Sequence, residues 1–395
     1  METKAGDPGA FAHFDLSRVP SPAFVVDEAA IRRNLAILAD IRDRAGIRML
    51  GALKAFSMWS LGGVVAEYLD GVCASGLYEA RLGREEYGGP DGGKEVATYC
   101  AAYKPDDLAE ILKISDHVIF NSPGQIARMK PVIDAARADG QRFDIGLRIN
   151  PLHAEGEVPK YDPSQPHSRL GFPIDQLRTD HLEGVDGLHV HNLCEQDFLP
   201  LERTWAAIES RIRTHTKSLK WLNFGGGHHI TRADYQRDSL VAFLHGIKAE
   251  TGLELYLEPG EAMALDAGIL AGEILDVIDN GMPVAITDIS ATCHMPDVIE
   301  APYRPAMLDE ETDGPATRLG GPSCLAGDII GDYRVPGGAT PGRRIAFLDQ
   351  AHYSMVKTNT FNGVPLPAIW LWNSETDELK EIRRFSYEDF RNRLS

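Results

Sequence analysis

The stretch Arg48-Met49-Leu50-Gly51-Ala52-Leu53-Lys54-Ala55-Phe56-Ser57 is a short apolar run with a lysine near its end. Five of the six residues from Met49 to Lys54 are small or apolar, which is typical of a buried strand. Burial makes a lysine amine less basic and more nucleophilic. We therefore expect Lys54 to be buried and able to form a Schiff base with a carbonyl cofactor. The alternative is a lysine that only extends to the surface at a strand end.

Similar apolar runs recur after this stretch, separated mostly by amphipathic segments. Together with the first run they are Arg48–Lys54, Gly71–Ser75, Glu95–Ala101, His117–Asn121, Asp144–Asn150, Gly187–Leu193, Trp221–Gly225 and Glu254–Glu258. Strands that alternate with helices in this way predict a (β/α)8 TIM-like barrel of the α/β class. The connection from Pro151 to about Asp186 is expected to be a long loop with only a short helix.

The barrel places a set of polar or glycine residues at the carboxyl ends of its strands. They are Lys54, Asn121, Asn150, His191, Gly225 and Glu258. In barrels of this kind the active site lies at that end. These residues are therefore the candidates for chemistry.

The remainder of the chain has a different residue pattern, with runs of β-branched residues between glycines and prolines. The runs are Ile269–Ile278, Pro283–Ile289, Arg343–Asp349 and Ile369–Trp372. They predict a C-terminal all-β domain over residues 266–395, after a barrel over 28–265. A strand near 22–27 is expected to join that β domain, and Glu310–Gly321 is expected to be a mobile loop.

Composition restricts the class of protein. The formal net charge of -18 disfavours nucleic acid and anionic membranes as partners and favours a cationic ligand. The 5 cysteines are odd in number and have no CxxC spacing, which argues against a disulfide framework and a structural zinc site. No apolar run approaches the roughly 18 residues of a membrane span, and we expect a cytoplasmic protein.

Two strand ends carry further candidate groups. In Asn223-Phe224-Gly225-Gly226-Gly227-His228-His229, three glycines allow backbone N–H groups to surround a phosphate, ahead of a helix expected near Thr231. An ordinary flexible turn is the alternative. Glu258, in Leu257-Glu258-Pro259-Gly260-Glu261, is suited to hold the proton of a pyridine nitrogen, unless it belongs to a surface turn.

Histidines and a cysteine complete the candidates. His189 and His191 alternate along one strand and point the same way, but no third ligand has a convincing spacing, so we expect no metal. A histidine stacked on a cofactor ring is the preferred interpretation. The turn at Cys324 carries a thiol and the carboxylate of Asp328, although a structural cysteine is the commoner case, and Tyr353 offers a phenol.

Taken together, these motifs resemble the pyridoxal-phosphate decarboxylases of the alanine-racemase fold, which include the ornithine, arginine and diaminopimelate decarboxylases. The resemblance extends from about Pro22 to Gly363. It is strongest to members that act on carboxyspermidine and carboxynorspermidine, through Ala52-Leu53-Lys54-Ala55-Phe56-Ser57, Gly187-Leu188-His189-Val190-His191-Asn192-Leu193-Cys194-Glu195, Glu258-Pro259-Gly260-Glu261-Ala262 and Thr292-Cys293-His294-Met295-Pro296-Asp297.

The resemblance implies a decarboxylase of a cationic, carboxylated polyamine with pyridoxal 5'-phosphate as cofactor. Lys54 would carry the cofactor as a Schiff base, His191 would stack on its ring, and Glu258 would pair with the pyridine nitrogen. The phosphate would lie against Gly225, Gly226 and Gly227, with Tyr353 as a further phosphate contact and Arg148 near the cofactor.

The resemblance also implies a homodimer with shared active sites. Cys324 matches a cysteine that enters the site from a partner subunit. Either Cys324 or Lys54 would protonate the Cα atom of the substrate after the carboxylate has left. Two departures concern the substrate. Glu261 replaces an arginine of the basic decarboxylases, and the carboxylate nearest to Cys324 is Asp328 instead of the next residue. Glu261, Asp297 and Asp328 are therefore the expected ligands of substrate amines.

Three alternatives stay open at this point. A decarboxylase of diaminopimelate or ornithine is disfavoured by Glu261. A racemase of this fold typically has an arginine at the pyridine nitrogen, so Glu258 disfavours it. Cofactor carriers without turnover resemble the barrel alone, and the additional β domain fits them poorly.

Overall fold

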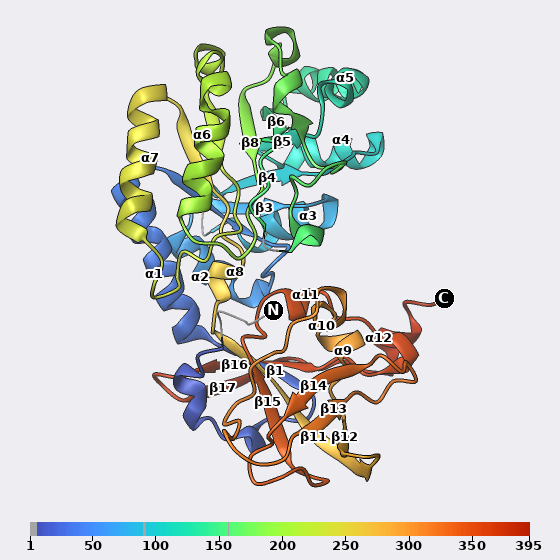
Figure 1. Cartoon of the computed structure of the whole chain (residues 1–395). Helices are drawn as coiled ribbons and strands as arrows, with labels where there is room; N and C mark the ends of the chain where they lie inside the picture. Colours follow the sequence, from blue (N-terminus) through green and yellow to red (C-terminus); the bar gives the residue numbers. More distant parts are fainter. Residues whose placement is uncertain (1–5, 90–91, 157) are drawn as a thin grey trace. The chain divides into compact units, whose positions relative to one another are not determined.

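The computed structural model describes residues 6–89, 92–156 and 158–395, which belong to two compact units (Figure 1). One unit, the barrel unit, contains Asn34–Met263. The other, the sheet unit, contains the chain up to Arg33 together with Ala264–Ser395. Helix α1 (Glu28–Ala45) spans the first boundary between them.

The barrel unit contains a closed ring of parallel strands. In ring order they are β2 (Arg48–Ala52), β3 (Gly71–Ala74), β4 (Glu95–Tyr99), β5 (His117–Phe120), β6 (Asp144–Asn150), β8 (Gly187–Val190), β9 (Trp221–Asn223) and β10 (Glu254–Leu257). Pairing of β10 with β2 closes the ring. The predicted (β/α)8 barrel is confirmed, and each expected strand is present. A short additional strand, β7 (Phe172–Pro173), pairs with β6.

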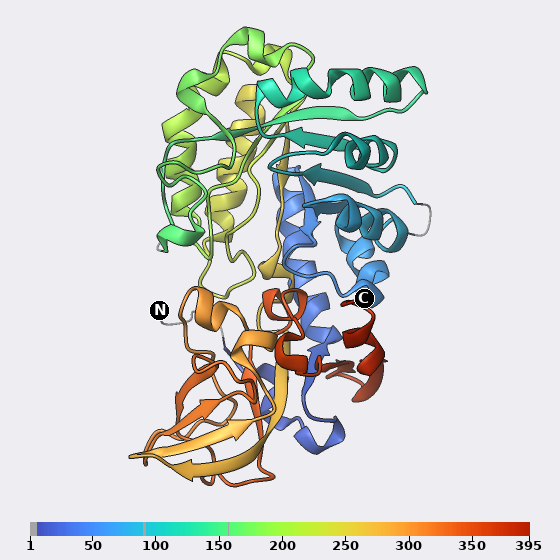
Figure 2. The same cartoon turned by 90° about the vertical axis from the view of Figure 1, so that its right-hand side faces the viewer.

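Helices connect most of these strands and lie around the ring in both views (Figures 1 and 2). After α1 they are α2 (Gly62–Tyr68), α3 (Leu77–Glu86), α4 (Pro105–Ile114), α5 (Pro123–Ala138), α6 (Leu199–Arg213), α7 (Arg237–Thr251) and α8 (Glu261–Ala264). In α4, for example, Leu108, Ile111 and Leu112 are buried on one face. Among its described residues, the long connection after β6 contains β7 and short 3-10 turns at Pro159–Tyr161, Ile174–Gln176 and Thr179–Leu182.

The start of α7 corrects one expectation. The sequence predicts a helix near Thr231, but α7 begins at Arg237. The Arg237 guanidinium donates hydrogen bonds to the carbonyls of Ile230, Thr231 and Arg232, so these carbonyls face a side chain instead of helical amides. A side-chain contact of this kind has no local sequence pattern.

Inside the barrel, a large aromatic residue is accommodated by two glycines. Trp221 packs in a buried cluster with Leu50, Ile119 and Tyr256. A Cβ atom at Gly187 would lie 2.0 Å from the Trp221 ring, and one at Gly146 would lie 2.6 Å from it. Glycine is required at both positions because the indole occupies the space of their side chains.

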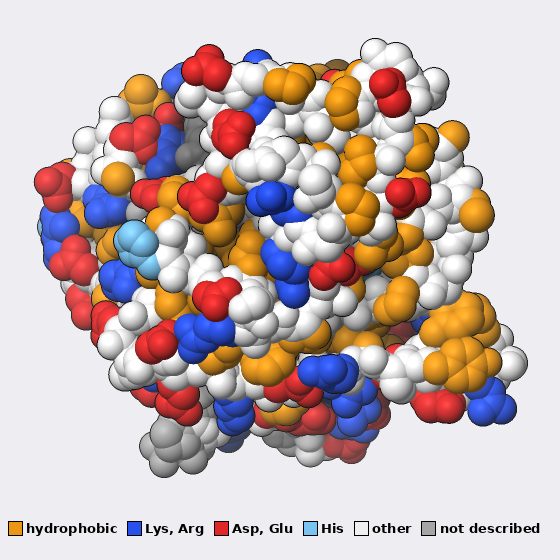
Figure 3. All heavy atoms as spheres, turned by 90° about the horizontal axis from the view of Figure 1, so that it is seen from below, with side chains coloured by type: hydrophobic (Ala, Val, Ile, Leu, Met, Phe, Trp, Pro, Cys, Tyr) orange, Lys and Arg blue, Asp and Glu red, His pale blue; other side chains and the backbone are white. Residues whose placement is uncertain are grey.

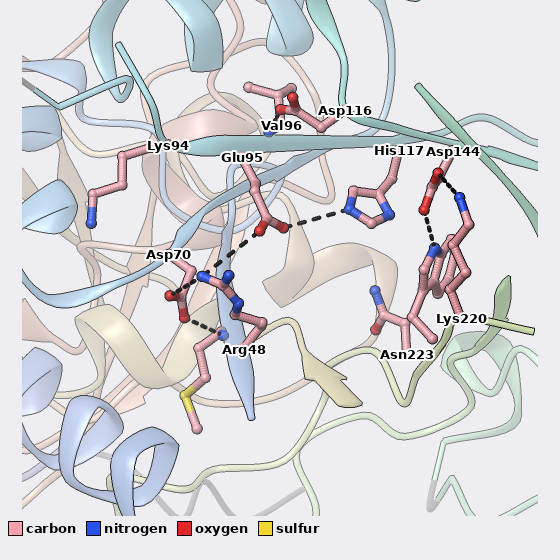
Figure 4. Close-up of polar contacts among 12 residues, drawn as sticks. Arg48, Asp70, Lys94, Glu95, Val96, Asp116, His117, Asp144, Lys220 and Asn223 are labelled. Atoms are coloured by element: carbon pink, nitrogen blue, oxygen red, sulfur yellow. Dashed lines mark hydrogen bonds and ion pairs between the residues drawn. The ribbon is translucent and has the colours of Figure 1, made fainter. Parts of the chain in front are cut away.

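At the amino-terminal end of the barrel, aspartates link neighbouring strands in a repeated manner (Figure 4). Three of them lie one residue before a strand. Each carboxylate accepts a hydrogen bond from the backbone N–H of the second residue of the strand that comes before it in the ring. The pairs are Asp70 with Met49 at 2.9 Å, Asp116 with Val96 at 2.8 Å, and Asp186 with Ile145 at 2.9 Å. These bonds fix the strand register where the barrel begins.

The sheet unit is built on one mixed sheet. Its strand order is β14 (Ile329–Tyr333), β13 (Thr317–Gly320), β12 (Pro283–Thr287), β11 (Gly268–Asp279), β1 (Ala23–Asp27), β16 (Ala368–Asn373) and β17 (Glu378–Arg383), and β15 (Arg344–Leu348) pairs with β11. Strand β1 runs antiparallel to β11 and parallel to β16. Short helices complete the unit: α9 (Ala291–His294), α10 (Asp297–Glu300), α11 (Tyr353–Val356) and α12 (Tyr387–Arg391).

The sheet corrects the expectation of a mobile loop over Glu310–Gly321. Residues Thr317–Gly320 form β13, which lies between β12 and β14. The strand has four residues and includes an arginine and a glycine, so its own sequence carries no strand signal. Pairing with neighbours distant in the sequence, not local propensity, makes it a strand.

The surface carries charges of both signs. On the face drawn in Figure 3, acidic and basic side chains are interspersed with hydrophobic ones among the described residues. Within the part of the chain that the structure describes, no helix is long and apolar enough to cross a membrane.

Candidate active site

Lys54 lies just beyond the end of β2, at the carboxyl-terminal mouth of the barrel. The strand ends at Ala52, whose carbonyl accepts the N–H groups of Ala55 and Phe56. The expected burial of Lys54 is wrong, because its side chain is exposed beyond this turn. Its Nζ lies 3.4 Å from Nε2 of His191, so the amine points toward a residue that is predicted to contact the cofactor.

His191 follows β8 and is held by the glycine turn. The backbone N–H of Gly226 donates to its Nδ1 at 2.9 Å. Because a backbone amide only donates, the neutral ring carries its proton on Nε2, the atom that faces Lys54. Burial and the cations of Lys54 and Arg148 hold the pKa of His191 well below its usual value, which keeps the ring neutral. A neutral, flat ring is suited to stack on an aromatic cofactor.

Glu258 follows β10 and is a buried carboxylate with a donor on each oxygen. His189 Nε2 lies 3.0 Å from Oε2, and Asn223 Nδ2 donates to Oε1 at 2.8 Å. Burial raises the pKa of a carboxyl group, but His189, Asn223 and Lys54 outweigh it, so the pKa of Glu258 is lowered. An ionised carboxylate with remaining lone pairs is an acceptor suited to a protonated ring nitrogen.

Arg148, on β6, lies next to these groups. Its Nη2 donates to the carbonyl of His191 at 2.8 Å, and its guanidinium lies 4.5 Å from the ring centroid of Tyr99. The Tyr99 hydroxyl donates to Oδ1 of Asn121 at 2.6 Å. Burial lowers the pKa of Arg148 and raises that of Tyr99. The arginine is thus a buried cation fixed by a carbonyl and an aromatic face.

The glycine turn fits a close backbone approach. A Cβ at Gly225 would lie 2.5 Å from the His191 ring, one at Gly226 would lie 2.1 Å from the Glu258 carbonyl oxygen, and one at Gly227 would lie 1.9 Å from the Leu193 carbonyl oxygen. The turn therefore requires glycine at each position to pack against the strand ends. The N–H groups of Gly225 and Gly226 already donate to Asn223 and His191.

Glu261 is the first residue of α8, and it has a partner within the barrel unit. His229 Nε2 lies 3.2 Å from Oε2 of Glu261, and the histidine side chain is 5% exposed. The glutamate is thus located beside the glycine turn. The predicted contact of Glu261 with a substrate amine stays a prediction.

The other predicted residues belong to the sheet unit. The oxygens of buried Asp328 accept hydrogen bonds from the hydroxyls of Ser290 and Ser323, at 2.8 and 2.6 Å, and from the N–H of Thr292. Asp328 therefore organises the turn that contains Cys324. Cys324 is exposed.

Two more predicted residues lie close together in that unit. Asp297 forms an ion pair with Lys357 at 2.5 Å. The Lys357 ammonium lies 5.5 Å from the ring of Tyr353, at the start of α11. The roles predicted for Asp297 and Tyr353 stay predictions.

The sequence did not identify Asn223 or Tyr99 as parts of the site, and it indicated Asn121 only as a strand-end candidate without a partner. His189 was recognised only as a neighbour of His191 on the same strand. All four residues stand at the ends of barrel strands, in the positions where polar side chains already indicated the site. That position was the available signal, but it did not reveal which carboxylate or ring they contact.

Comparison with known proteins gives a consistent result. A family model described as "Pyridoxal-dependent decarboxylase, C-terminal sheet domain" matches residues 23–351. The carboxyaminopropylagmatine decarboxylase of Synechocystis is 39% identical over 96% of this chain and 96% of its own. The carboxynorspermidine/carboxyspermidine decarboxylase of Campylobacter jejuni is 35% identical over 94% of this chain and 98% of its own.

A solved structure resembles most of the chain. The carboxynorspermidine decarboxylase of Campylobacter jejuni, crystallised with norspermidine, has a TM-score of 0.85 and 35% identity, covering 95% of this chain and 100% of its own. The diaminopimelate decarboxylase of Helicobacter pylori shares the fold, with a TM-score of 0.78 at 17% identity.

Proposed function

The chain belongs to the family of pyridoxal-dependent decarboxylases, and we propose that it removes the carboxylate of carboxynorspermidine or carboxyspermidine to give norspermidine or spermidine. The observation that carries the proposal is the similarity to the Campylobacter jejuni enzyme over nearly the full length of both chains. The ionised, buried Glu258 near the amine of Lys54 supports it chemically.

We propose that the barrel residues hold pyridoxal 5'-phosphate. Lys54 would bind it covalently through its amine, Glu258 would accept a hydrogen bond from its protonated ring nitrogen, and His191 would lie against its ring. The phosphate would lie near Gly225, Gly226 and Gly227, and Arg148 and Tyr353 are the additional residues proposed to contact the cofactor. When bound, this cofactor serves as the sink for the electron pair that a departing carbon dioxide leaves behind.

The chain's own groups would handle the protons of the reaction. Lys54 would exchange with the substrate amine, which its exposure at the mouth permits. A proton would then be returned to Cα by Lys54 or by Cys324. Because Cys324 is exposed, we propose that it serves the site of a second copy, in a cytoplasmic homodimer with shared active sites.

Carboxylates would recognise the amines of the substrate. We propose Glu261, Asp297 and Asp328 for this role, in a protein whose net charge of -18 attracts cations. We also propose residues 28–265 as the cofactor-binding barrel and 266–395 as the β domain.

A second candidate substrate is carboxyaminopropylagmatine. The observation in its favour is the 39% identity to the Synechocystis decarboxylase named for it. Such a substrate ends in a guanidinium group, which pairs with carboxylates in a planar, two-bonded manner.

The test is carbon dioxide release by the purified protein supplied with pyridoxal phosphate. Carboxynorspermidine, carboxyspermidine, carboxyaminopropylagmatine, diaminopimelate and ornithine are offered in parallel. We expect kcat/KM to be highest for carboxynorspermidine or carboxyspermidine. Preference for carboxyaminopropylagmatine would select the second candidate, and preference for diaminopimelate or ornithine would contradict both.

A further inference from the structure

His189 has no role in the proposed function, yet it contacts the carboxylate on which that function depends. Its Nε2 lies 3.0 Å from Oε2 of Glu258, and both side chains are buried. Asn223 donates to the other oxygen, Oε1, at 2.8 Å. The three residues come from different barrel strands or strand ends, so the contacts fix the carboxylate relative to the barrel itself.

The remaining nitrogen of His189 indicates which way its proton lies. Nδ1 is buried and has no hydrogen-bond partner among the described residues. A neutral imidazole has one N–H, and we assign it to Nε2, where an acceptor is present. Burial is the largest cause that lowers the pKa of His189; Glu258 raises it, but burial together with the cations of Arg148 and Lys54 outweighs that effect, so the pKa is lowered. The ring is therefore a neutral donor to Glu258.

Stacking holds the imidazole in that orientation. The Tyr99 ring lies 5.7 Å from the His189 ring at an interplanar angle of 24°. The His191 ring lies 6.3 Å away at 12°. The rings of Tyr99 and of His191, the proposed ring-stacking residue, thus both lie roughly parallel to the His189 ring and flank it within the barrel mouth.

We propose that His189 is a positioning residue, which together with Asn223 keeps the buried Glu258 ionised and fixes the orientation of its carboxylate. Burial by itself favours a protonated Glu258, and a protonated carboxyl group offers a weaker acceptor to a ring nitrogen. The inference rests on the proposed function, because the group that Glu258 would serve is the cofactor's pyridine nitrogen. It concerns ionisation of a protein carboxylate, which is measurable without cofactor.

The test compares His189→Leu with His189→Gln. Glutamine places a donor close to the position of Nε2, whereas leucine removes the donor and keeps an apolar volume. We expect the pH midpoint for ionisation of Glu258, read by carbon-13 NMR of glutamate-labelled, cofactor-free protein and assigned with Glu258→Gln, to rise by about one unit or more in His189→Leu. His189→Gln is expected to stay near the unaltered protein.

The same variants are then titrated with bound pyridoxal phosphate. The acid-side pH midpoint of its visible absorbance is expected to rise in His189→Leu and to be restored in His189→Gln. His117→Leu, which removes a histidine at the opposite end of the barrel, is the control for a merely structural effect and is expected to shift neither midpoint. If His189→Leu does not fold by circular dichroism, Asn223→Leu takes its place.

Unchanged midpoints in a folded His189→Leu protein would overturn the inference. A rise that glutamine does not reverse would also overturn it, because the effect would then be structural. If the unaltered protein bound no pyridoxal phosphate, the proposed function would fail, whereas the NMR titration would still decide whether His189 keeps Glu258 ionised.

Discussion

The two ends of the barrel use charged residues in opposite ways. At the amino-terminal end, Arg48 pairs with Asp70 at 2.9 Å and Lys220 pairs with Asp144 at 2.7 Å (Figure 4). Lys220 also pairs with Asp186 at 2.8 Å. At the carboxyl-terminal end, the Lys54 ammonium faces a histidine at 3.4 Å. Arg148, at the same end, lies over the Tyr99 ring and donates to the carbonyl of His191.

This difference separates stability from chemistry within one ring of strands. The aspartates at the amino-terminal end also accept backbone N–H groups, so their charges are used to fix the register of the strands. At the other end the amine of Lys54 and the lone pairs of Glu258 retain capacity for further partners. We therefore expect substitutions at the two ends to affect different measurements.

The largest expected effect is at Lys54. Replacement of Lys54 by alanine removes the nucleophilic amine, and we expect the decarboxylation rate to fall on the order of 10³-fold or more. The measurement is kcat/KM from carbon dioxide release, with Lys220→Ala, a lysine at the opposite end of the barrel, as the matched control. Equal losses of kcat/KM in the two variants would contradict the difference between the two ends of the barrel.

The next largest effect is expected at Glu258. Glu258→Gln keeps the shape of the side chain and removes its charge, so we expect kcat of the folded variant to fall by about 10²–10³-fold. The readouts are steady-state kinetics and thermal unfolding. A folded variant with normal kcat would show that the ionised carboxylate at this end has no part in the chemistry.

At the amino-terminal end the expected effect is on stability. Asp70→Ala leaves the Met49 N–H without its acceptor and Arg48 with only the more distant Glu95 as ion-pair partner, and we expect a loss of about 1–3 kcal/mol in the free energy of unfolding. Asp70→Asn, which keeps an acceptor for the Met49 N–H, should lose less unfolding free energy. Urea unfolding followed by tryptophan fluorescence measures both. A fall in kcat of the folded Asp70→Ala protein would contradict the separation of the two ends.

The smallest effect is a pH dependence at the carboxyl-terminal end. Burial, and then the neighbouring His229, lowers the pKa of His228 to about 4. The folded state therefore binds fewer protons than the unfolded state below pH ~6.5. The contribution of His228 to the free energy of unfolding is thus fully present above that pH and is lost as pH falls toward about 4. At pH 5 the loss is up to about 2 kcal/mol.

His228→Asn tests this contribution. Asparagine does not titrate, and its side chain can replace Nδ1 as the partner of the Tyr235 hydroxyl, which lies 2.8 Å away. We expect the difference in unfolding free energy between pH 7.5 and pH 5 to be smaller in the variant. Lys220→Met, at the amino-terminal end, should keep the full difference. Identical pH slopes in His228→Asn and the unaltered protein would refute the prediction.

The barrel and most of the residues at its carboxyl-terminal mouth could be predicted from the sequence. Each barrel strand is a short run that is buried on both faces, and this pattern is encoded locally by apolar residues such as those from Met49 to Leu53. Since parallel strands in one barrel all end on the same side, the residues that follow them converge whatever the details of packing. Lys54, His191 and Glu258 were identified on this basis, and their chemical roles stay predictions.

The exposure, pairing and ionisation of these residues depend on the folded structure. The exposure of Lys54 depends on a turn after β2, and the start of α7 depends on the reach of Arg237. The strand β13 exists because β12 and β14 flank it. The ionisation of Glu258 depends on His189 and Asn223, which are 69 and 35 residues away along the chain. Charge, exposure and pairing are set by neighbours in space, whereas a sequence pattern reports only neighbours along the chain.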